Sequence, residues 1–201
     1  GRLESALDRL RHVTRHDPNS FEAQYSLAYV LQELGRWPQA IDAYRRAVAL
    51  KPNVALSRLN LAAALEVMGR LDEAIAVLRE LADQKHARLR AIIRIAQLKP
   101  ASITPEDFAD LARTAENPDA PVGIRISSLF AMGEILEKQG RYDEAFAAFA
   151  EGNRLRRENI SEPVEEEGVI APPGARIVHD TPEAAARKHQ MAVANISGRL
   201  T

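Results

Sequence analysis

Two pairs of side chains, each spaced four residues apart, are the ones best placed to do chemistry. His12 and His16 have the spacing of a two-histidine metal site on one helix face. No glutamate lies between them and no third ligand is evident, so two surface histidines are the favoured interpretation, and we predict no metal site. Arg90 and Arg94 would also share one helix face, where paired guanidinium groups suit a carboxylate or a sulfate.

The motifs of common catalytic sites are missing from the sequence. The chain contains no cysteine, which excludes disulfides, thiolate zinc sites and a cysteine nucleophile. It also lacks a Gly-x-Ser-x-Gly nucleophile elbow, a phosphate-binding loop and a His-Glu-x-x-His zinc motif. We therefore expect no catalytic residues and no cofactor, and predict that this chain is not an enzyme by itself.

The composition favours a soluble helical protein. Of the 201 residues, 46% are hydrophobic and only 5% are aromatic, so the core must consist mainly of aliphatic side chains, which suit close helix packing. A formal net charge of -1 provides no general attraction to nucleic acid or to an acidic membrane. No apolar run approaches the roughly 18 residues that span a bilayer. These features suit the cytoplasm. Because the chain begins at Gly1 inside a repeat, we interpret it as part of a longer protein.

A pattern that returns every 34 residues runs through the first half of the chain. Glycine, alanine and large apolar residues recur at this step: Gly1, Gly35 and Gly69; Ala6, Ala40 and Ala74; Leu3, Trp37 and Leu71. A fixed period of this length indicates a solenoid, in which similar two-helix units stack on one another. Solenoids usually bind partners along a concave face and rarely do chemistry. Paired helices are therefore the elements that must position the candidate side chains.

The unit at residues 21–52 shows how each helix pair is expected to form. Its first helix should run from about Phe21 to Leu34, with Ser20 or the residue before it as N-cap. Gly35 follows as the helix stop, where a positive φ costs a glycine nothing extra. Pro38 falls in the first turn of the second helix, where its missing N–H is harmless.

Small residues are expected to set the distance between the two helices of each pair. A β-branched or aromatic residue at these positions would push the helices apart. Together with the helix-ending glycines they form a repeat signature: Ala28, Gly35 and Ala40 in one unit, Ala62, Gly69 and Ala74 in the next, and Gly133, Gly140 and Ala145 in the last.

The signature resembles that of the tetratricopeptide repeat. The residues that carry the resemblance are Leu27-Ala28, Leu31, Gly35-Arg36-Trp37, Ala40, Tyr44, Ala47 and Pro52, and the pattern returns from Leu61 and from Met132. The resemblance implies an all-α fold, a right-handed α-solenoid of helix-turn-helix units with a C-terminal capping helix.

The predicted solenoid covers residues 1–157. It comprises a half repeat at 1–18, regular repeats at 21–52 and 55–86, a degenerate helix pair at 87–120 and a last repeat at 126–157. In the degenerate pair we expect helices at Ala87–Leu98 and Pro105–Glu116, splayed because Phe108 replaces a small residue. A linker at 158–180 and a final helix at 181–201, which would dock on the last repeat, complete the predicted chain.

A second resemblance concerns the last repeat. The run from Phe130 to Phe146, followed by Phe149-Ala150-Glu151-Gly152-Asn153-Arg154-Leu155, is similar to the final repeat of bacterial tetratricopeptide-repeat sulfotransferases. That resemblance implies a catalytic domain beyond Thr201 that uses 3′-phosphoadenosine-5′-phosphosulfate. The Pro-Arg-Ser-Gly-Thr type of loop that binds this cofactor does not occur in the 201 residues, so no catalytic residue of that family can be assigned to this chain.

The first helix of each pair is expected to line the binding groove. The candidate ligand-binding residues are Tyr25, Tyr29, Asn60, Arg90 and Arg94. Tetratricopeptide domains that grip chaperone tails use a carboxylate clamp, and this set matches the later clamp positions only, because tyrosines stand where the first Lys and Asn should be. The alternative is that the tyrosines pack the seam between repeats and the arginines are solvated.

We therefore predict a scaffold module that binds a protein or peptide partner in its concave groove, and neither nucleic acid nor membrane. The alternative function is the acceptor-recruiting arm of a sulfotransferase. A further expectation is self-association through the open N-terminal end of the solenoid, where half a repeat is missing.

Overall fold

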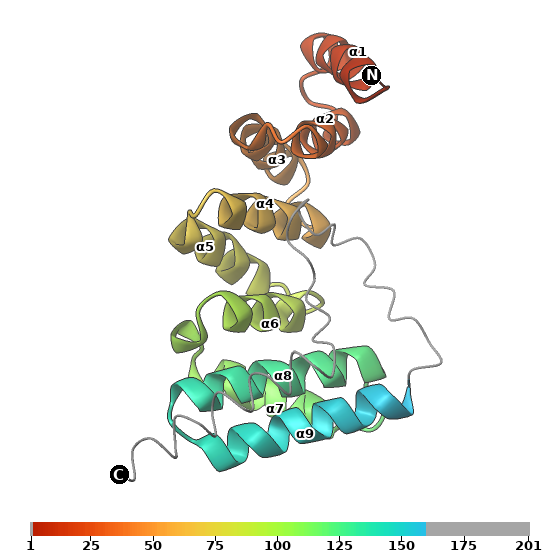
Figure 1. Ribbon diagram of the computed structural model, residues 1–201. Coiled ribbons are helices and arrows are strands. Elements are labelled where there is room, and N and C mark those ends of the chain that lie inside the picture. Colours follow the sequence, from red (N-terminus) through yellow and green to blue (C-terminus); the bar gives the residue numbers. More distant parts are fainter. Residues whose placement is uncertain (1, 160–201) are drawn as a thin grey trace. The chain divides into compact units, whose positions relative to one another are not determined.

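The structure is a computed structural model that describes residues 2–159, and every regular element among these residues is a helix (Figure 1). The helices are α1 (Arg2–His16), α2 (Phe21–Glu33), α3 (Trp37–Leu50), α4 (Ala55–Val67), α5 (Leu71–Ala82), α6 (Arg88–Leu98), the short 3-10 helix η1 (Pro100–Ser102), α7 (Pro105–Glu116), α8 (Val122–Lys138) and α9 (Tyr142–Glu158). The expected all-α solenoid is confirmed for this part of the chain. No described helix is both long enough and apolar enough to cross a membrane.

The predicted helix ends agree with the structure to within a residue in the unit at residues 21–52. Ser20 is the N-cap of α2, and its hydroxyl oxygen accepts a hydrogen bond from the Ala23 N–H at 3.2 Å. The last helix, α9, ends one residue inside the predicted linker, and α8 begins four residues before the predicted last repeat. The rest of the predicted linker and the final helix at 181–201 lie outside the described residues.

Three helix-ending glycines adopt the backbone conformation that the period predicts. Gly35, Gly69 and Gly140 have φ values of 69°, 70° and 77°. In the first of these turns, the Gly35 N–H donates to the Gln32 carbonyl at 2.9 Å and the Arg36 N–H donates to the Leu31 carbonyl at 2.8 Å. This pair of bonds is a Schellman motif, which satisfies the last carbonyls of the helix. It recurs after α4 and after α8, so the chain reverses in the same way each time.

Each hairpin closes on the small residues that the sequence singles out. Ala28 and Ala40 are fully buried between α2 and α3, and Ala62 and Ala74 occupy the same place between α4 and α5. Between α8 and α9, a Cβ added to Gly133 would overlap the ring of Phe149. The close approach of the two helices therefore depends on small side chains at these positions.

Successive units share a continuous core through α1 to α6. Side chains from neighbouring pairs interlock in it, and the largest fully buried ones include Leu7, Tyr44, Leu65 and Leu78. The first helix of each pair packs on the second helix of the pair before it, as α2 does on α1 and α4 on α3. The core is therefore built from contacts between neighbours along the chain.

The degenerate pair departs from this arrangement. The helices α6 and α7 contact each other over a small area, and α7 packs chiefly against α8. Phe108 of α7 is partly buried against a cluster that includes Ile92 of α6 and Leu111 of α7. The turn between the two helices is longer than in the regular pairs and contains η1. The splayed packing expected from Phe108 is thus present.

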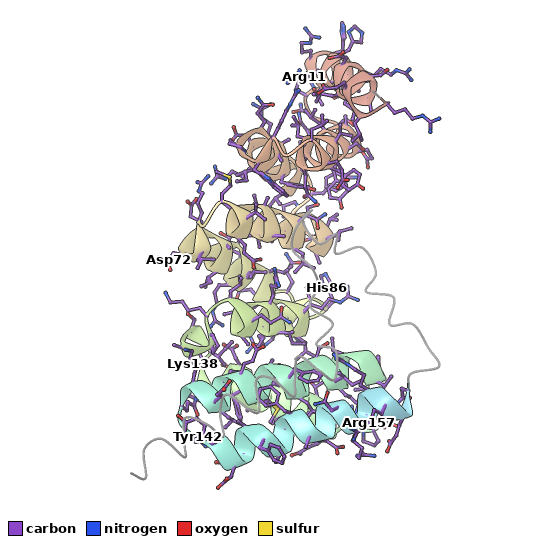
Figure 2. The ribbon with its side chains drawn as sticks, viewed as in Figure 1. Arg11, Asp72, His86, Lys138, Tyr142 and Arg157 are labelled. Atoms are coloured by element: carbon purple, nitrogen blue, oxygen red, sulfur yellow. The ribbon has the colours of Figure 1, made fainter. Side chains whose placement is uncertain are left out.

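A lateral polar contact repeats with the same 34-residue period as the core. Arg11 of α1 reaches Gln39 of α3 at 3.4 Å (Figure 2). Arg45 of α3 pairs with Glu73 of α5 at 2.9 Å, 34 residues later. The next contact follows the same step, with Arg79 of α5 and Asp107 of α7 at 2.5 Å. Helix α7, the second helix of the degenerate pair, therefore keeps the lateral contact that α3 and α5 make, although its contact with α6 is small.

Asp107 is the most buried carboxylate of this series. Its side chain is only 3% exposed, and it also accepts hydrogen bonds from the Thr104 N–H at 3.1 Å and from Arg88 at 3.3 Å. Burial alone would raise the pKa of Asp107, but the hydrogen bonds from Arg79 and Thr104 outweigh it and the pKa is lowered. One carboxylate thus caps α7 and ties it to α5 and α6.

Gly133→Ala should destabilise the last hairpin. In an open helix this change stabilises by about 0.5–1 kcal/mol, but here the new methyl group would overpack Phe149, at a cost of about 1–3 kcal/mol. The urea midpoint of unfolding should therefore fall, and Gly133→Ala combined with Phe149→Leu should recover part of the loss. An unchanged or raised midpoint in Gly133→Ala would show that the helices are not held at this distance.

Asp107→Asn should lower the free energy of unfolding by roughly 2–3 kcal/mol, because two arginines lose their buried partner. Glu73→Gln is the matched control, since it changes the same lateral contact at an exposed site and should have little effect. The lowered pKa means that the stabilisation by Asp107 is complete above its unfolded pKa, near 4, and is lost as the pH falls through its folded pKa. Denaturation curves between pH 2 and pH 7 should therefore converge for parent and Asp107→Asn at the acid end. Parallel curves would contradict this role.

Candidate functional site

The candidate binding residues lie on the first helix of three successive units. Tyr25 and Tyr29 are on α2, Asn60 is on α4, and Arg90 and Arg94 are on α6. The four-residue spacing within α2 and within α6 places each pair on one helix face. We call these five residues the candidate face. Contacts between α2 and α4, and between α4 and α6, bring part of the set together.

Tyr25 lies at the seam between the second and third units. Its ring stacks on Phe21 with centroids 5.8 Å apart and meets the edge of Tyr44 at 5.9 Å. Its hydroxyl oxygen accepts a hydrogen bond from Nδ2 of Asn60 at 2.8 Å. Partial burial raises the pKa of Tyr25, against the opposing effect of the Asn60 hydrogen bond. Tyr25 is therefore a partly exposed phenol held in place by the next repeat.

Asn60 is the buried member of the candidate face and lies beneath its exposed side chains. The residue is 1% exposed, and its hydrogen bond to Tyr25 ties α4 to α2. Gln32 of α2 is buried as well and accepts a hydrogen bond from the Tyr44 hydroxyl at 3.0 Å. Burial raises the pKa of Tyr44. These polar side chains join α2, α3 and α4, and Asn60 can act on a ligand only through Tyr25.

The two arginines of α6 differ in their surroundings. Arg94 is partly buried and forms an ion pair with Glu66 of α4, and it also donates to Gln97 at 3.0 Å. Arg90 is exposed and has no hydrogen bond or ion pair within residues 2–159. Arg94 therefore fastens α6 to α4, whereas Arg90 offers a whole guanidinium group to a ligand.

Tyr29 completes the accessible part of the candidate face. Its ring packs partly buried against the core, and its hydroxyl makes no hydrogen bond within the described residues. The face thus presents free donors at Tyr29 and Arg90, and partly engaged ones at Tyr25 and Arg94. Phenol and guanidinium groups donate to carbonyl and carboxylate oxygens, so the arrangement suits binding of a polar, acceptor-rich ligand.

The partner that sequence reasoning missed is Glu66. The sequence around Glu66 gives no sign that its carboxylate pairs with Arg94. The separation of 28 residues between Glu66 and Arg94 equals that of Arg45 and Glu73. Opposite charges 28 residues apart on neighbouring repeats are the signal that would have found it.

The histidine pair weighed in the sequence lies elsewhere, and so do two arginines near the end of α9. The rings of His12 and His16 are 4.4 Å apart on an exposed part of α1, and no group of three or more metal-ligating side chains occurs within the described residues. Arg154 pairs with Glu151 at 2.6 Å and with Glu158 at 2.7 Å, and Arg156 lies over the Phe130 ring at 4.7 Å. These cations are occupied by their own helix and its neighbour.

Comparisons with known proteins agree with the repeat architecture. One tetratricopeptide-repeat profile matches residues 1–55 and 25–87, and another matches 126–159, which together cover more than half of the chain. A crystal structure of MamA superimposes with a TM-score of 0.63 at 18% identity, over 80% of this chain and 92% of that one. The structure of MamA 41-end from Desulfovibrio magneticus RS-1 gives 0.60 at 20% identity, over 79% and 88%.

The structural similarities to MamA establish the fold and no more than the fold, because the sequence identities are low. No curated protein matches the sequence. None of the comparisons supports the predicted resemblance to sulfotransferases.

Tyr25→Phe should destabilise the protein more than Tyr29→Phe does. The first change deletes the acceptor of a buried amide, which should lower the free energy of unfolding by about 1–2 kcal/mol. The second deletes a hydroxyl that bonds to no described residue and should leave stability unchanged. Urea denaturation of both variants provides the measurement. Equal effects would show that the Asn60 hydrogen bond does not hold the seam.

Proposed function

Since this chain belongs to the tetratricopeptide-repeat family, we propose that it is a protein-interaction module that binds an extended peptide segment of a partner across the first helices α2, α4 and α6. The observation that carries the proposal is the placement of Tyr25, Tyr29, Arg90 and Arg94 on these successive helices. Lateral bonds hold the helices together, so the donors are fixed before a ligand arrives. Such preorganisation reduces the entropy lost on binding.

The chemistry of the candidate face favours a partner segment with an acidic end. Arg90 is unpaired at the α6 end, where a carboxylate would find a free guanidinium group. The tyrosines at the α2 end suit backbone carbonyls and apolar side chains. Two helix diameters separate α2 from α6, roughly 20 Å, which about six extended residues would span.

Self-association through the exposed apolar residues of α1 is the competing hypothesis. Leu3 and Val13 of α1 are 41% and 44% exposed, which supports the expected open end of the solenoid. This surface lies on a different helix from the candidate face, so the two can be separated. Sedimentation that gives only monomer over a wide concentration range would remove this alternative. The sulfotransferase-arm alternative has no comparable observation in its favour, and we do not propose it.

Peptides selected from a random library should bind the candidate face. Parent protein is used to select short peptides by display, and their affinities are compared for two double variants. Tyr29→Phe with Arg90→Ala removes two donors that bond to no other repeat while the Tyr29 ring stays packed on the core, so the affinity should fall at least about tenfold. The selected peptides should be enriched in Asp or Glu at one end.

The matched control is Tyr142→Ala with Arg157→Ala on α9. Both residues are exposed and far along the chain from the candidate face (Figure 2). This variant should bind as the parent does. If both double variants keep full affinity, or lose it equally, the selected peptides bind elsewhere and the proposed face is wrong.

A further inference from the structure

A small cavity opens between the start of α6 and the last turns of α7. Its volume is about 150 Å³, and it is lined by Lys85, Arg88, Leu89, Asp110, Arg113 and Thr114. One lining residue, Lys85, directly precedes His86, which is labelled in Figure 2. None of the candidate-face residues lines this cavity, so it is a separate feature of the molecule.

The cavity follows from the splayed packing of the degenerate pair. In the regular hairpins, alanines bring the two helices into contact along their length. Here α7 makes its main contact with α8, and Arg88 in the first turn of α6 reaches Asp110 of α7 through a side-chain hydrogen bond. The loose packing of this pair therefore leaves room for a cavity lined by side chains of both helices.

Positive charge predominates among the lining side chains. Three of them are cationic and only Asp110 is anionic. Asp110 uses one carboxylate oxygen to accept from Nε of Arg88 at 2.7 Å and the other to accept from Nη1 of Arg113 at 2.8 Å. The hydrogen bond from Arg88 keeps the pKa of Asp110 below its ordinary value. The single carboxylate is thus ionised and fully engaged in positioning the two arginines.

Several donors remain unused. Arg88 also approaches Glu106 and Asp107 at 3.3 Å, so it is anchored. Arg113 bonds only to Asp110 among the described residues, and its side chain is 75% exposed. Lys85 is exposed and has no partner within residues 2–159. Two cations therefore face the cavity with free N–H groups.

The first turn of α6 strengthens the positive potential. This helix has no side-chain cap and no acidic residue in its first turn. The partial positive charge of its N-terminus is therefore not neutralised by the helix itself. The terminus adds to the field of the lysine and arginines, and an anion in the cavity would meet both.

We propose that this cavity, which we call the α6–α7 pocket, binds a phosphate group. Its volume admits an ion of that size, and Lys85 and Arg113 can donate to separate phosphate oxygens while Arg88 stays anchored by its carboxylate partners. The phosphate could be free in solution or carried by a phosphorylated peptide, since both present the same dianionic group. This site is independent of the peptide-binding face proposed above.

The test is an NMR titration of the protein with inorganic phosphate at constant ionic strength. Amide signals of residues 85–90 and 110–114 should shift and saturate, while sodium chloride at equal ionic strength should not reproduce the shifts. Lys85→Met combined with Arg113→Met should weaken the apparent affinity at least about tenfold. Both residues are exposed, so circular dichroism should confirm an unchanged fold.

The matched control replaces two exposed cations elsewhere, Lys138→Met with Arg157→Met (Figure 2), and should bind phosphate as the parent does. A short phosphoserine peptide and its unphosphorylated form distinguish the source of the phosphate. Tighter binding of the phosphopeptide than of inorganic phosphate indicates a peptide ligand, and equal binding indicates free phosphate. Shifts that chloride reproduces, or equal affinities in the two double variants, overturn the proposal.

Discussion

The rest of the structure depends on the close approach of two helices within each hairpin. The small residues of these hairpins are all buried: Ala28 and Ala40, Ala62 and Ala74, and Gly133 and Ala145. Small side chains at these crossings let the backbones come near enough for the larger aliphatic residues around them to interlock. Because the units stack in order, the first helices come to lie in succession, and so do the side chains on them. The placement of the candidate face is thus a consequence of packing.

Contacts between units are of two kinds, apolar and polar, and each kind has a different role. Apolar contacts form the shared core from α1 to α6, while polar contacts fix neighbouring units laterally. Some of these polar contacts lie on the candidate face itself, where Asn60 holds Tyr25 and Glu66 holds Arg94. Residues that hold the stack together are therefore mixed with residues that are free to bind, and only the latter can change without disturbing the fold.

The features that the sequence predicts well are those set by near neighbours in the chain. Ser20, Gly35 and Thr104 define helix ends through bonds to residues three to five positions away, and local patterns are enough to identify them. The pairing of Arg94 with Glu66 and the burial of Asn60 depend on how two units dock. A single sequence carries little information about docking angles. The packing of α7 against α8 could not be predicted for the same reason. Phe108 indicates poor packing of α7 with α6, but the sequence does not indicate which helix α7 contacts instead.

The lateral series of Arg11, Arg45 and Arg79 stops after α7. Arg113 stands one further period along the chain, yet it bonds to Asp110 of its own helix. Glu144 of α9 is occupied by Arg141 at 2.6 Å. Three extra residues between the degenerate pair and the last repeat take α9 out of step, since Ala145 does not fall on the 34-residue grid of Ala40 and Ala74. Up to α7, then, the chain could gain or lose whole 34-residue units and each new boundary would rebuild the same contacts. Beyond α7 a 34-residue unit could not be added or removed in this way, because the last repeat does not follow the same period. The repeats before it could therefore vary in number, whereas the last repeat could not be exchanged for one of them.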